Sequence, residues 1–390
     1  MKALSAQLQG LPASVTLAVN DKAKALRRAG HDIVVLAGGD PDFATPAHIV
    51  EAAFKAIENG ATHYPAPMKG IPSLLEAIAG KMEKDNGVTL NPQTDVVVTP
   101  GGKWALALAL SALVNPGDEV IYLEPVWVSY PPLITLSGGV PVAVSLPSET
   151  NFTITEELLR AKVTAKTKAI MVNSPSNPTG RVLTRAEVDA IVKVATEEDL
   201  YVISDELYEK LIYDGGTHYS LAAEPGMAER TLTVNGLSKA YAMTGWRLGW
   251  LAGPTPIIKL ATKMNSQTVS SAANFTMHAA VAALMGPQEA IAEMRDSYQA
   301  RRDFMVPALN EMEGVSCRMI EGAFYLFVHF PNSSKNSLEI ADVLLDAGIA
   351  GTPGIAFGAS GENHIRFSIA TAMADLEKAV ERLAKIAPNL

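Results

Sequence analysis

The sequence predicts an α/β protein, with a mostly parallel sheet in a large domain and a second, smaller α/β domain. Short runs rich in Val and Ile alternate with stretches of helical period through the middle of the chain, which is typical of a parallel sheet covered by helices on both faces. This pattern changes after about Gly286. The chain has 390 residues, which exceeds one domain at roughly 100–200 residues each. We expect a large domain over residues 46–287. Residues 1–45, with an N-terminal arm, and residues 288–390 should form the small domain.

Strands of the large domain are expected at short apolar runs rich in β-branched residues, because parallel strands are buried on both faces. A helical period marks Lys103–Leu113 and Thr184–Glu198, and Thr184 suits the N-cap position of the second helix. The expected strands are Asp95–Thr99, Glu119–Leu123, Val140–Leu146, Lys168–Val172, Leu200–Ser204 and Thr231–Val234.

The small domain is expected to alternate helices and strands. A long helix from Gln288 to Glu311 leads to a strand over Ala323–Phe330. A second helix follows, then a strand over His364–Ala370 and a final helix over Met373–Ile386. The first 45 residues do not fit the parallel series, and we expect them to join this domain.

Charge and composition disfavour several classes of protein. The 32 basic and 41 acidic residues give a net charge of −9, which disfavours a nucleic-acid binder held by phosphate contacts. A small anion can still bind to a local cluster of Arg and backbone N–H groups. The single cysteine, Cys317, excludes an intramolecular disulfide and a Cys-rich metal site, and it favours a reducing compartment. None of the seven histidines forms an HExxH motif, so no metal site is expected.

No segment has the pattern of a signal peptide or a membrane span. The N-terminus has one Lys and no sustained apolar stretch. The uncharged segment between Glu124 and Glu149 is rich in proline, and the one between Lys263 and Glu289 opens with polar residues. We expect a soluble, cytoplasmic protein with no membrane partner.

Polar side chains follow three neighbouring strands of the predicted sheet. Asn177 follows the first, within the run Ser-Asn-Pro-Thr-Gly. Asp205 and Tyr208 follow the second, and Lys239 follows the third. Alone, such an Asp is most often a turn former and such a Lys is usually solvated. Ligands collect outside the carboxyl ends of parallel strands, so we expect these four side chains to face one crevice.

Two further segments suit a phosphorylated cofactor. Gly101-Gly102-Lys103 lies between a strand and a helix, where backbone N–H groups can approach an anion, although a plain turn explains this run equally well. Arg247 follows Ser238 and Lys239, and a guanidinium can bind phosphate bidentately. A Lys near a cation tends to lose its proton and become nucleophilic. Asp205 could keep a pyridine nitrogen protonated, so the whole set suits pyridoxal phosphate.

The segment Gly236–Gly249 resembles the lysine-attachment signature of class I aminotransferases. The resemblance is greatest to the bacterial aspartate- and aromatic-aminotransferase-like branch. It implies the fold type I of pyridoxal-phosphate-dependent transferases. It also implies transfer of an amino group between an L-amino acid and a 2-oxo acid in two half-reactions. The other matching motifs are Gly38–Phe43, Thr62–Tyr64, Gly70–Pro72, Gly101–Lys103, Trp127, Asn177–Gly180, Asp205–Tyr208, Gly322–Tyr325 and Ile365–Ser368.

The resemblance implies a role in cofactor binding for residues spread along the chain. Lys239 would bind pyridoxal 5′-phosphate covalently and later move a proton, and Asp205 would pair with the ring nitrogen. Asn177 and Tyr208 would bond the ring oxygen, and Trp127 would stack on the ring. The phosphate would be held by Gly102, the backbone of Lys103, Ser238, Arg247 and Tyr64 of the partner subunit, which would make a homodimer obligatory.

The resemblance also implies a substrate-binding set. Arg366 would bind the α-carboxylate with help from the backbone of Gly39, and Trp127 and Asn177 would complete the substrate site. The pattern of His364–Ile369 agrees with this role, because apolar residues alternate and leave Arg366 on the polar face of the strand.

The expected donor is a neutral or aromatic amino acid. A donor such as aspartate needs a cation for its distal carboxylate, because a buried unpaired carboxylate is costly. No Arg or Lys occurs between Lys263 and Arg295, and Gly10-Leu11 rather than a Lys precedes Pro12. An aspartate aminotransferase remains the alternative, since a cation from another segment could substitute.

Other protein classes share part of this pattern. A pyridoxal-phosphate-dependent lyase or cyclase on the same fold would carry nearly every motif. The sensing domain of a transcription regulator is disfavoured, because the Gly38–Phe43 motif comes too early to leave room for a DNA-binding domain. A nicotinamide dehydrogenase is disfavoured because no GxGxxG follows a strand.

Overall fold

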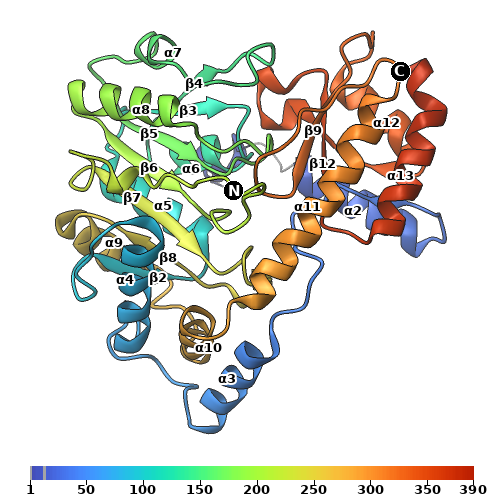
Figure 1. Cartoon of the computed structure of the whole chain (residues 1–390). Coiled ribbons are helices and arrows are strands. Elements are labelled where there is room, and N and C mark those ends of the chain that lie inside the picture. The colour runs from blue at the N-terminus through green and yellow to red at the C-terminus, as the bar shows by residue number, and fades with distance from the viewer. Residues whose placement is uncertain (1, 12–14) are drawn as a thin grey trace.

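The computed structural model describes residues 2–11 and 15–390, and its largest feature is a seven-stranded sheet (Figure 1). The strand order is β2-β8-β7-β6-β5-β3-β4, and β8 runs opposite to the other six strands. Each expected strand of the large domain is confirmed within one or two residues. The strands are β2 (Val96–Thr99), β3 (Glu119–Glu124), β4 (Val140–Ser145), β5 (Thr167–Asn173), β6 (Tyr201–Asp205), β7 (Thr231–Gly236) and β8 (Gly249–Ala252).

Strand β8 was not predicted. It has only four residues, and one of its two neighbours in the sheet, β2, is distant in sequence. A Cβ on Gly249 would lie 2.8 Å from the backbone nitrogen of Gly102, so only glycine lets β8 approach the start of α5 (Gly102–Leu113) this closely. The sequence pattern gives no sign of this packing.

Helices cover both faces of the large sheet, as predicted. On one face Ala169, Met171 and Ile203 pack against α5 (Gly102–Leu113) and α9 (Thr255–Thr268). On the other face Ile170 and Val202 pack against α8 (Arg185–Glu197) and α7 (Glu156–Arg160). Alternate residues of each strand therefore serve the two faces.

Helix α8 begins where the sequence predicts. Thr184 is the N-cap, and its hydroxyl accepts from the backbone N–H of Glu187. The Glu187 carboxylate in turn accepts from the backbone N–H of Thr184, which completes a capping box.

The C-terminal unit contains the expected order of helices and strands. Its three-stranded sheet has the order β11-β12-β9 (Figure 1). Strand β1 (Val34–Val35) pairs in parallel with β10 (Ile349–Ala350), so this N-terminal segment lies against the C-terminal unit. The domain boundaries expected above remain a prediction. The elements are α11 (Glu289–Asn310), β9 (Tyr325–His329), α12 (Ser337–Asp346), β11 (Thr352–Pro353), β12 (His364–Ser368) and α13 (Met373–Ile386).

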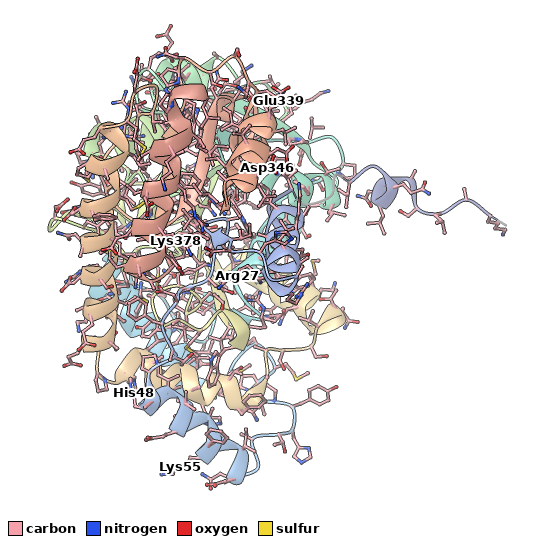
Figure 2. All side chains as sticks on the ribbon, turned by 90° about the vertical axis from the view of Figure 1, so that its right-hand side faces the viewer. Arg27, His48, Lys55, Glu339, Asp346 and Lys378 are labelled. Atoms are coloured by element: carbon pink, nitrogen blue, oxygen red, sulfur yellow. The ribbon has the colours of Figure 1, made fainter. Side chains whose placement is uncertain are left out.

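The remaining helices surround this framework. Helix α10 packs against α3 and α4 below the large sheet in Figure 1. The segment of residues 2–11, which includes α1, extends away from the rest of the chain (Figure 2), and its Gln7 side chain donates to the carbonyl of Thr135. Among the described residues, no helix has the length and apolar character that crossing a membrane requires. The remaining helices are α1 (Ala6–Gln9), α2 (Val15–Arg28), α3 (Ala47–Glu58), α4 (Pro72–Asn86), α6 (Tyr130–Leu136) and α10 (Asn274–Met285).

Candidate active site

A cavity of about 140 Å³ lies between the large sheet and the C-terminal unit. Asn173 at the end of β5 pairs with Asp205 at the end of β6, and Asp205 pairs with Val234 of β7, so the three strand ends are adjacent as predicted. The C-terminal unit contributes Tyr325 and Arg366 to the wall. Seven of the predicted site residues line the cavity: Gly39, Trp127, Asn177, Asp205, Tyr208, Lys239 and Arg366.

The amine of Lys239 is held inside this cavity. Its Nζ donates to the carbonyl of Gly39 at 2.6 Å and lies 5.9 Å from the centres of the Tyr208 and Phe324 rings. Burial lowers the pKa of Lys239 to about 8, and the charges of Arg366 and Arg247 act in the same direction. An amine with this pKa is available near neutral pH as the neutral nucleophile.

The carboxylate of Asp205 is buried beside Lys239. Burial raises the pKa of Asp205 to about 6, while hydrogen bonds from Tyr130 and from the backbone of Leu207 oppose the rise. The Tyr130 hydroxyl donates to Oδ2 at 2.7 Å, and the Leu207 N–H donates to Oδ1 at 3.3 Å. Asp205 therefore carries its charge around neutral pH and has lone pairs left for a ligand.

Two tyrosines of the cavity wall contact each other. The hydroxyls of Tyr208 and Tyr325 are 3.0 Å apart. Burial raises the pKa of both, so both phenols stay protonated at neutral pH. Tyr325 belongs to a motif that the sequence analysis recognised, but no role was assigned to it.

Arg366 is a buried cation that faces the cavity. Its side chain lies over the rings of Tyr325 and Phe357, with Cζ at 4.4 and 4.9 Å from the ring centres. It donates to Oδ1 of Asn177 and to the carbonyl of Ala37, each at 3.0 Å. Its Nε has no hydrogen-bond partner among the described residues. A buried guanidinium with a free donor is suited to a carboxylate ligand.

The predicted alternation along β12 is confirmed, with one difference. Arg366 shares a face with His364 and Ser368, but all five residues of the strand are buried. The polar face of β12 is turned toward the large domain, where Phe152 lies 5.7 Å from the ring of His364.

A corner next to the cavity, at the start of α5, has space beside a guanidinium. Gly101 has a φ of +92°, and a Cβ there would lie 2.5 Å from Nη2 of Arg247. The N–H groups of Gly102 and Lys103 begin α5 and have no partner within the helix, whereas the N–H of Trp104 already donates to the Gly101 carbonyl. Leu207 lines the cavity and would touch a Cβ on Gly102, so the start of α5 lies next to the cavity. The corner is therefore suited to a phosphate group on a ligand in the cavity.

The other predicted residues lie outside the cavity wall. Ser238 is buried next to Lys239, and Tyr64 is 76% exposed on the surface of this chain. The Lys103 ammonium lies 4.8 Å from the centre of the Trp127 ring, and burial and Arg247 lower its pKa. No carboxylate of the described residues forms an ion pair with Lys103. Pro12, which no Lys precedes and which therefore counted against an acidic donor, lies outside the described residues.

Sequence reasoning missed several residues of the site. Asn173, Leu207 and Tyr325 line the cavity, and Tyr130, which does not line it, donates a hydrogen bond to Asp205. Leu207 lies within the motif Asp205–Tyr208 and Asn173 directly follows the expected strand Lys168–Val172, so both had a usable signal. Tyr130 is 75 positions from Asp205 in sequence, and nothing in the pattern links the two.

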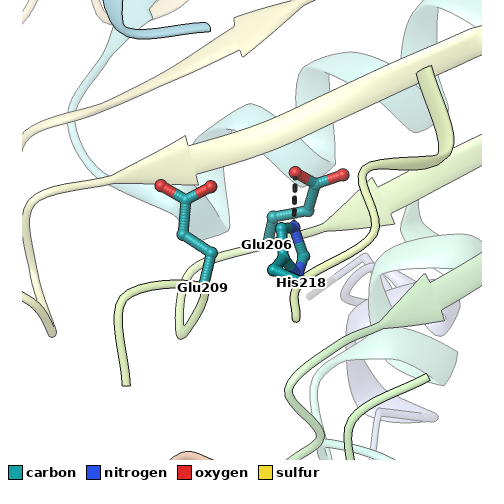
Figure 3. A group of neighbouring side chains, drawn as sticks. All are labelled: Glu206, Glu209 and His218. Carbon is teal, nitrogen blue, oxygen red and sulfur yellow. Dashed lines mark hydrogen bonds and ion pairs between the residues drawn. The ribbon is translucent and has the colours of Figure 1, made fainter. Parts of the chain in front are cut away.

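A second group of ionisable side chains begins at Glu206, directly after Asp205 in the chain (Figure 3). Glu206, Glu209 and His218 are close enough to share a metal ion, and His218 Nε2 is 3.0 Å from Glu206 Oε2. Lys81 forms an ion pair with Glu209, and the Asn86 amide donates to both carboxylates. These partners already occupy the carboxylate oxygens, so the group is an internal ion-pair network that fixes the turn after Asp205 to α4.

The chain is similar to known proteins over nearly its whole length. The family model for class I and II aminotransferases matches residues 31–383. The chain is 43% identical to the aspartate/prephenate aminotransferase of Thermus thermophilus, over 99% of each chain. It is 41% identical to the aspartate aminotransferase of Geobacillus stearothermophilus, over 97% of this chain and 98% of the relative.

Solved structures of similar enzymes have the same fold. The aspartate aminotransferase from Thermus thermophilus with maleate superposes with a TM-score of 0.95 at 41% identity, over 99% of this chain and 100% of that one. The aromatic aminotransferase from Pyrococcus horikoshii superposes with a TM-score of 0.92 at 40% identity, over 99% of each chain.

Proposed function

The chain belongs to the class I and II aminotransferases and transfers amino groups, and we propose that it does so with pyridoxal 5′-phosphate bound to Lys239. The observation that carries this proposal is the juxtaposition of Lys239 and Asp205. A buried amine with a pKa of about 8 and a buried carboxylate line one small cavity. An amine for covalent attachment and an acid for a pyridine nitrogen are the two groups that this cofactor requires.

The residues around the cavity fit the rest of the cofactor. Asp205 would hold the ring nitrogen, and Tyr208 and Asn177 would bond the ring oxygen. When bound, the cofactor supplies an electron sink for the bond broken at the substrate Cα. The ring would stack on Trp127, and the phosphate would lie in the corner formed by Gly102, Lys103 (backbone), Ser238 and Arg247, where the glycine at position 101 leaves space.

Protein side chains would hold the substrate and move its proton. Arg366, whose Nε is free, would bind the α-carboxylate together with the backbone of Gly39, and Asn177 and Trp127 would border the same site. Lys239 lies within 2.6 Å of the Gly39 carbonyl, so its amine is next to the proposed carboxylate site. It would take the Cα proton as a base and return it as an acid.

Product analysis tests this function. Purified protein is freed of cofactor and then assayed with an amino acid and a 2-oxo acid, with and without pyridoxal 5′-phosphate. We expect equal amounts of new 2-oxo acid and new amino acid. The rate of their formation should rise with added cofactor until the protein is saturated. Release of ammonia or loss of a side chain without new amino acid would indicate a lyase on the same fold.

We propose an acidic amino acid such as aspartate as the donor. Lys103 supplies a cation beside Trp127 that has no carboxylate partner among the described residues, and the sequence argument did not consider its side chain. The relatives named as aspartate aminotransferases support the same choice. A neutral or aromatic donor is the second candidate, supported by the aromatic cavity wall and by the relative named as an aromatic aminotransferase.

Assembly and location are also proposals. Tyr64 is exposed in the single chain, and we propose that Tyr64 of the partner subunit completes the phosphate site in a homodimer. The single cysteine, which suits a reducing compartment, supports a cytoplasmic location.

A further inference from the structure

Tyr130 is a buried tyrosine whose hydroxyl bonds the carboxylate at the centre of the proposed site. It begins α6 and has no exposed surface. Its Oη donates to Oδ2 of Asp205 at 2.7 Å. Its ring meets Trp127 edge-on, with 5.9 Å between ring centres and an interplanar angle of 84°, and its backbone N–H donates to the Trp127 carbonyl. Tyr130 therefore contacts both the carboxylate and the aromatic wall.

Asp205 depends on very few hydrogen bonds for its charge. Within the described chain, its carboxylate accepts from Tyr130 at 2.7 Å and from the Leu207 N–H at 3.3 Å. A short O–H···O⁻ bond is among the strongest hydrogen bonds in proteins, and a 3.3 Å bond is much weaker. Burial works against the ionised form. The Tyr130 hydroxyl is therefore the main protein group that favours the carboxylate over the carboxylic acid.

The direction of this bond is fixed. Burial and the charge of Asp205 raise the pKa of Tyr130 well above its usual range. The phenol consequently keeps its proton at any working pH and acts only as a donor. The neighbouring Glu206 adds negative charge that disfavours ionisation of Asp205, which increases the need for a donor on the other side.

We propose that Tyr130 is a positioning residue that keeps Asp205 ionised and oriented for the ring nitrogen of the cofactor. The inference rests on the proposed function, and it assigns to Tyr130 a role that acts through Asp205. It also links that role to Trp127, because both residues lie in one turn of chain.

Cofactor affinity of the Tyr130→Phe variant tests the inference without an activity assay. The variant keeps the ring and its packing and loses only the O–H. Apo-protein is titrated with pyridoxal 5′-phosphate, and with the 1-deaza analogue, which has carbon in place of the ring nitrogen. We expect affinity for the true cofactor to fall about 10- to 100-fold, as the loss of one hydrogen bond to a charged group implies. Affinity for the analogue should change little.

The same variant should alter the titration of Asp205. In apo-protein with ¹³C-labelled aspartate, the Asp205 carboxyl should titrate at higher pH in Tyr130→Phe than in the wild type. Tyr213→Phe is the matched control, because it removes another buried hydroxyl, which donates to the Ala323 carbonyl and not to Asp205. Should Tyr130→Phe not fold, 3-fluorotyrosine at position 130 retains the O–H and makes it a stronger donor, so Asp205 should titrate at lower pH than in the wild type.

The outcomes separate this inference from the proposed function. If wild-type protein binds neither compound, the cofactor assignment itself is wrong. If the wild type binds the cofactor and Tyr130→Phe shows the same affinity and the same Asp205 titration, Tyr130 has no positioning role. An equal loss for cofactor and analogue would also overturn it, because that result indicates a general packing defect.

Discussion

Burial prepares individual side chains of this site for chemistry. It lowers the pKa of Lys239 to about 8 and raises that of Asp205 to about 6, so the two values approach neutrality from opposite sides. The same burial leaves Arg366 as a cation without a carboxylate partner among the described residues. Each group is costly to bury alone, and a bound cofactor and substrate would offset that cost.

Which residues line the cavity was largely predictable from the sequence, whereas the contacts between them were not. Lys239, Asp205 and Arg366 were found from their positions at strand ends and within motifs, and the cavity contains all three. Tyr130 was missed because a hydrogen bond across 75 positions leaves no local pattern. The side chain of Lys103 was missed because its place beside Trp127 depends on the packing of two separate elements.

Replacing Asp205 by Asn should remove the charge that keeps the ring nitrogen protonated. We expect kcat at saturating cofactor to fall by about 10²–10³-fold, which is typical for the loss of one preorganised electrostatic group. Steady-state kinetics with a single donor and acceptor measures this. Asp199→Asn, at an exposed turn, serves as the control. Unchanged kcat in Asp205→Asn would contradict the role.

Replacing Lys103 by Met should change donor preference. The backbone N–H stays in place, and only the cation beside Trp127 is lost. For aspartate we expect kcat/KM to fall about 10- to 100-fold, as for a lost charge-assisted hydrogen bond, with little change for phenylalanine. Measuring kcat/KM for both donors with one common acceptor tests whether Lys103 determines the donor preference. A wild type that prefers phenylalanine or methionine to aspartate would favour the neutral donor instead.

At the scale of elements, Lys81 and Asn86 of α4 bind the group shown in Figure 3 and fix the turn after β6 to that helix. Lys81 of α4 pairs with Glu209, and Asn86 bridges Glu209 and Glu206. The turn starts at Asp205, so the network also restrains the main chain of the site. The sequence predicted the strand and the turn, but it gave no sign of this buried polar support.

Replacing Lys81 by Met should destabilise the fold, because it leaves Glu209 buried without its partner. We expect a loss of about 3–5 kcal/mol in the free energy of unfolding, measured with urea at pH 7. Lys385→Met, which breaks the exposed pair with Glu381, should cost less than about 1 kcal/mol. Equal effects of the two variants would show that the buried pair is no stronger than a surface pair.

The same network predicts how stability depends on pH. Lys81 and His218 help to lower the pKa of Glu209 from 4.5 to about 2, against the effect of burial. A carboxyl whose pKa is lower in the folded state stabilises the fold fully above the unfolded value. This contribution should be present above about pH 4.5 and be lost as the pH falls toward 2. The free energy of unfolding, measured with urea at several pH values in this range, should rise less steeply with pH in Lys81→Met than in the wild type. An identical pH dependence in the two proteins would refute the assignment.

At the scale of the whole molecule, the large sheet was predictable because buried parallel strands have a simple sequence pattern. Strand β8 and the pairing of β1 with β10 were not predicted, since both are very short and join distant segments. The cavity depends on such long-range packing, because Gly39, Trp127 and Arg366 meet there from three separate parts of the chain. Motifs indicated which residues belong to the site, and the fold determines how close they lie.

Activity should depend on assembly if Tyr64 of the partner subunit completes the phosphate site. In this chain the Tyr64 side chain is 76% exposed and does not line the cavity. We expect specific activity to fall on dilution as dimers dissociate, and Tyr64→Phe to weaken cofactor binding without changing the association constant. Sedimentation during assay tests this, and a fully active monomer would refute the prediction.

The central claim is that the cofactor binds to Lys239, and borohydride trapping tests it most directly. Reduction of the protein loaded with pyridoxal 5′-phosphate fixes the cofactor to whichever amine holds it, and peptide mapping by mass spectrometry then identifies that residue. The account predicts one labelled peptide that contains Lys239, and no label in the Lys239→Arg variant. A label on Lys103 or on any other lysine in the wild type would contradict the account.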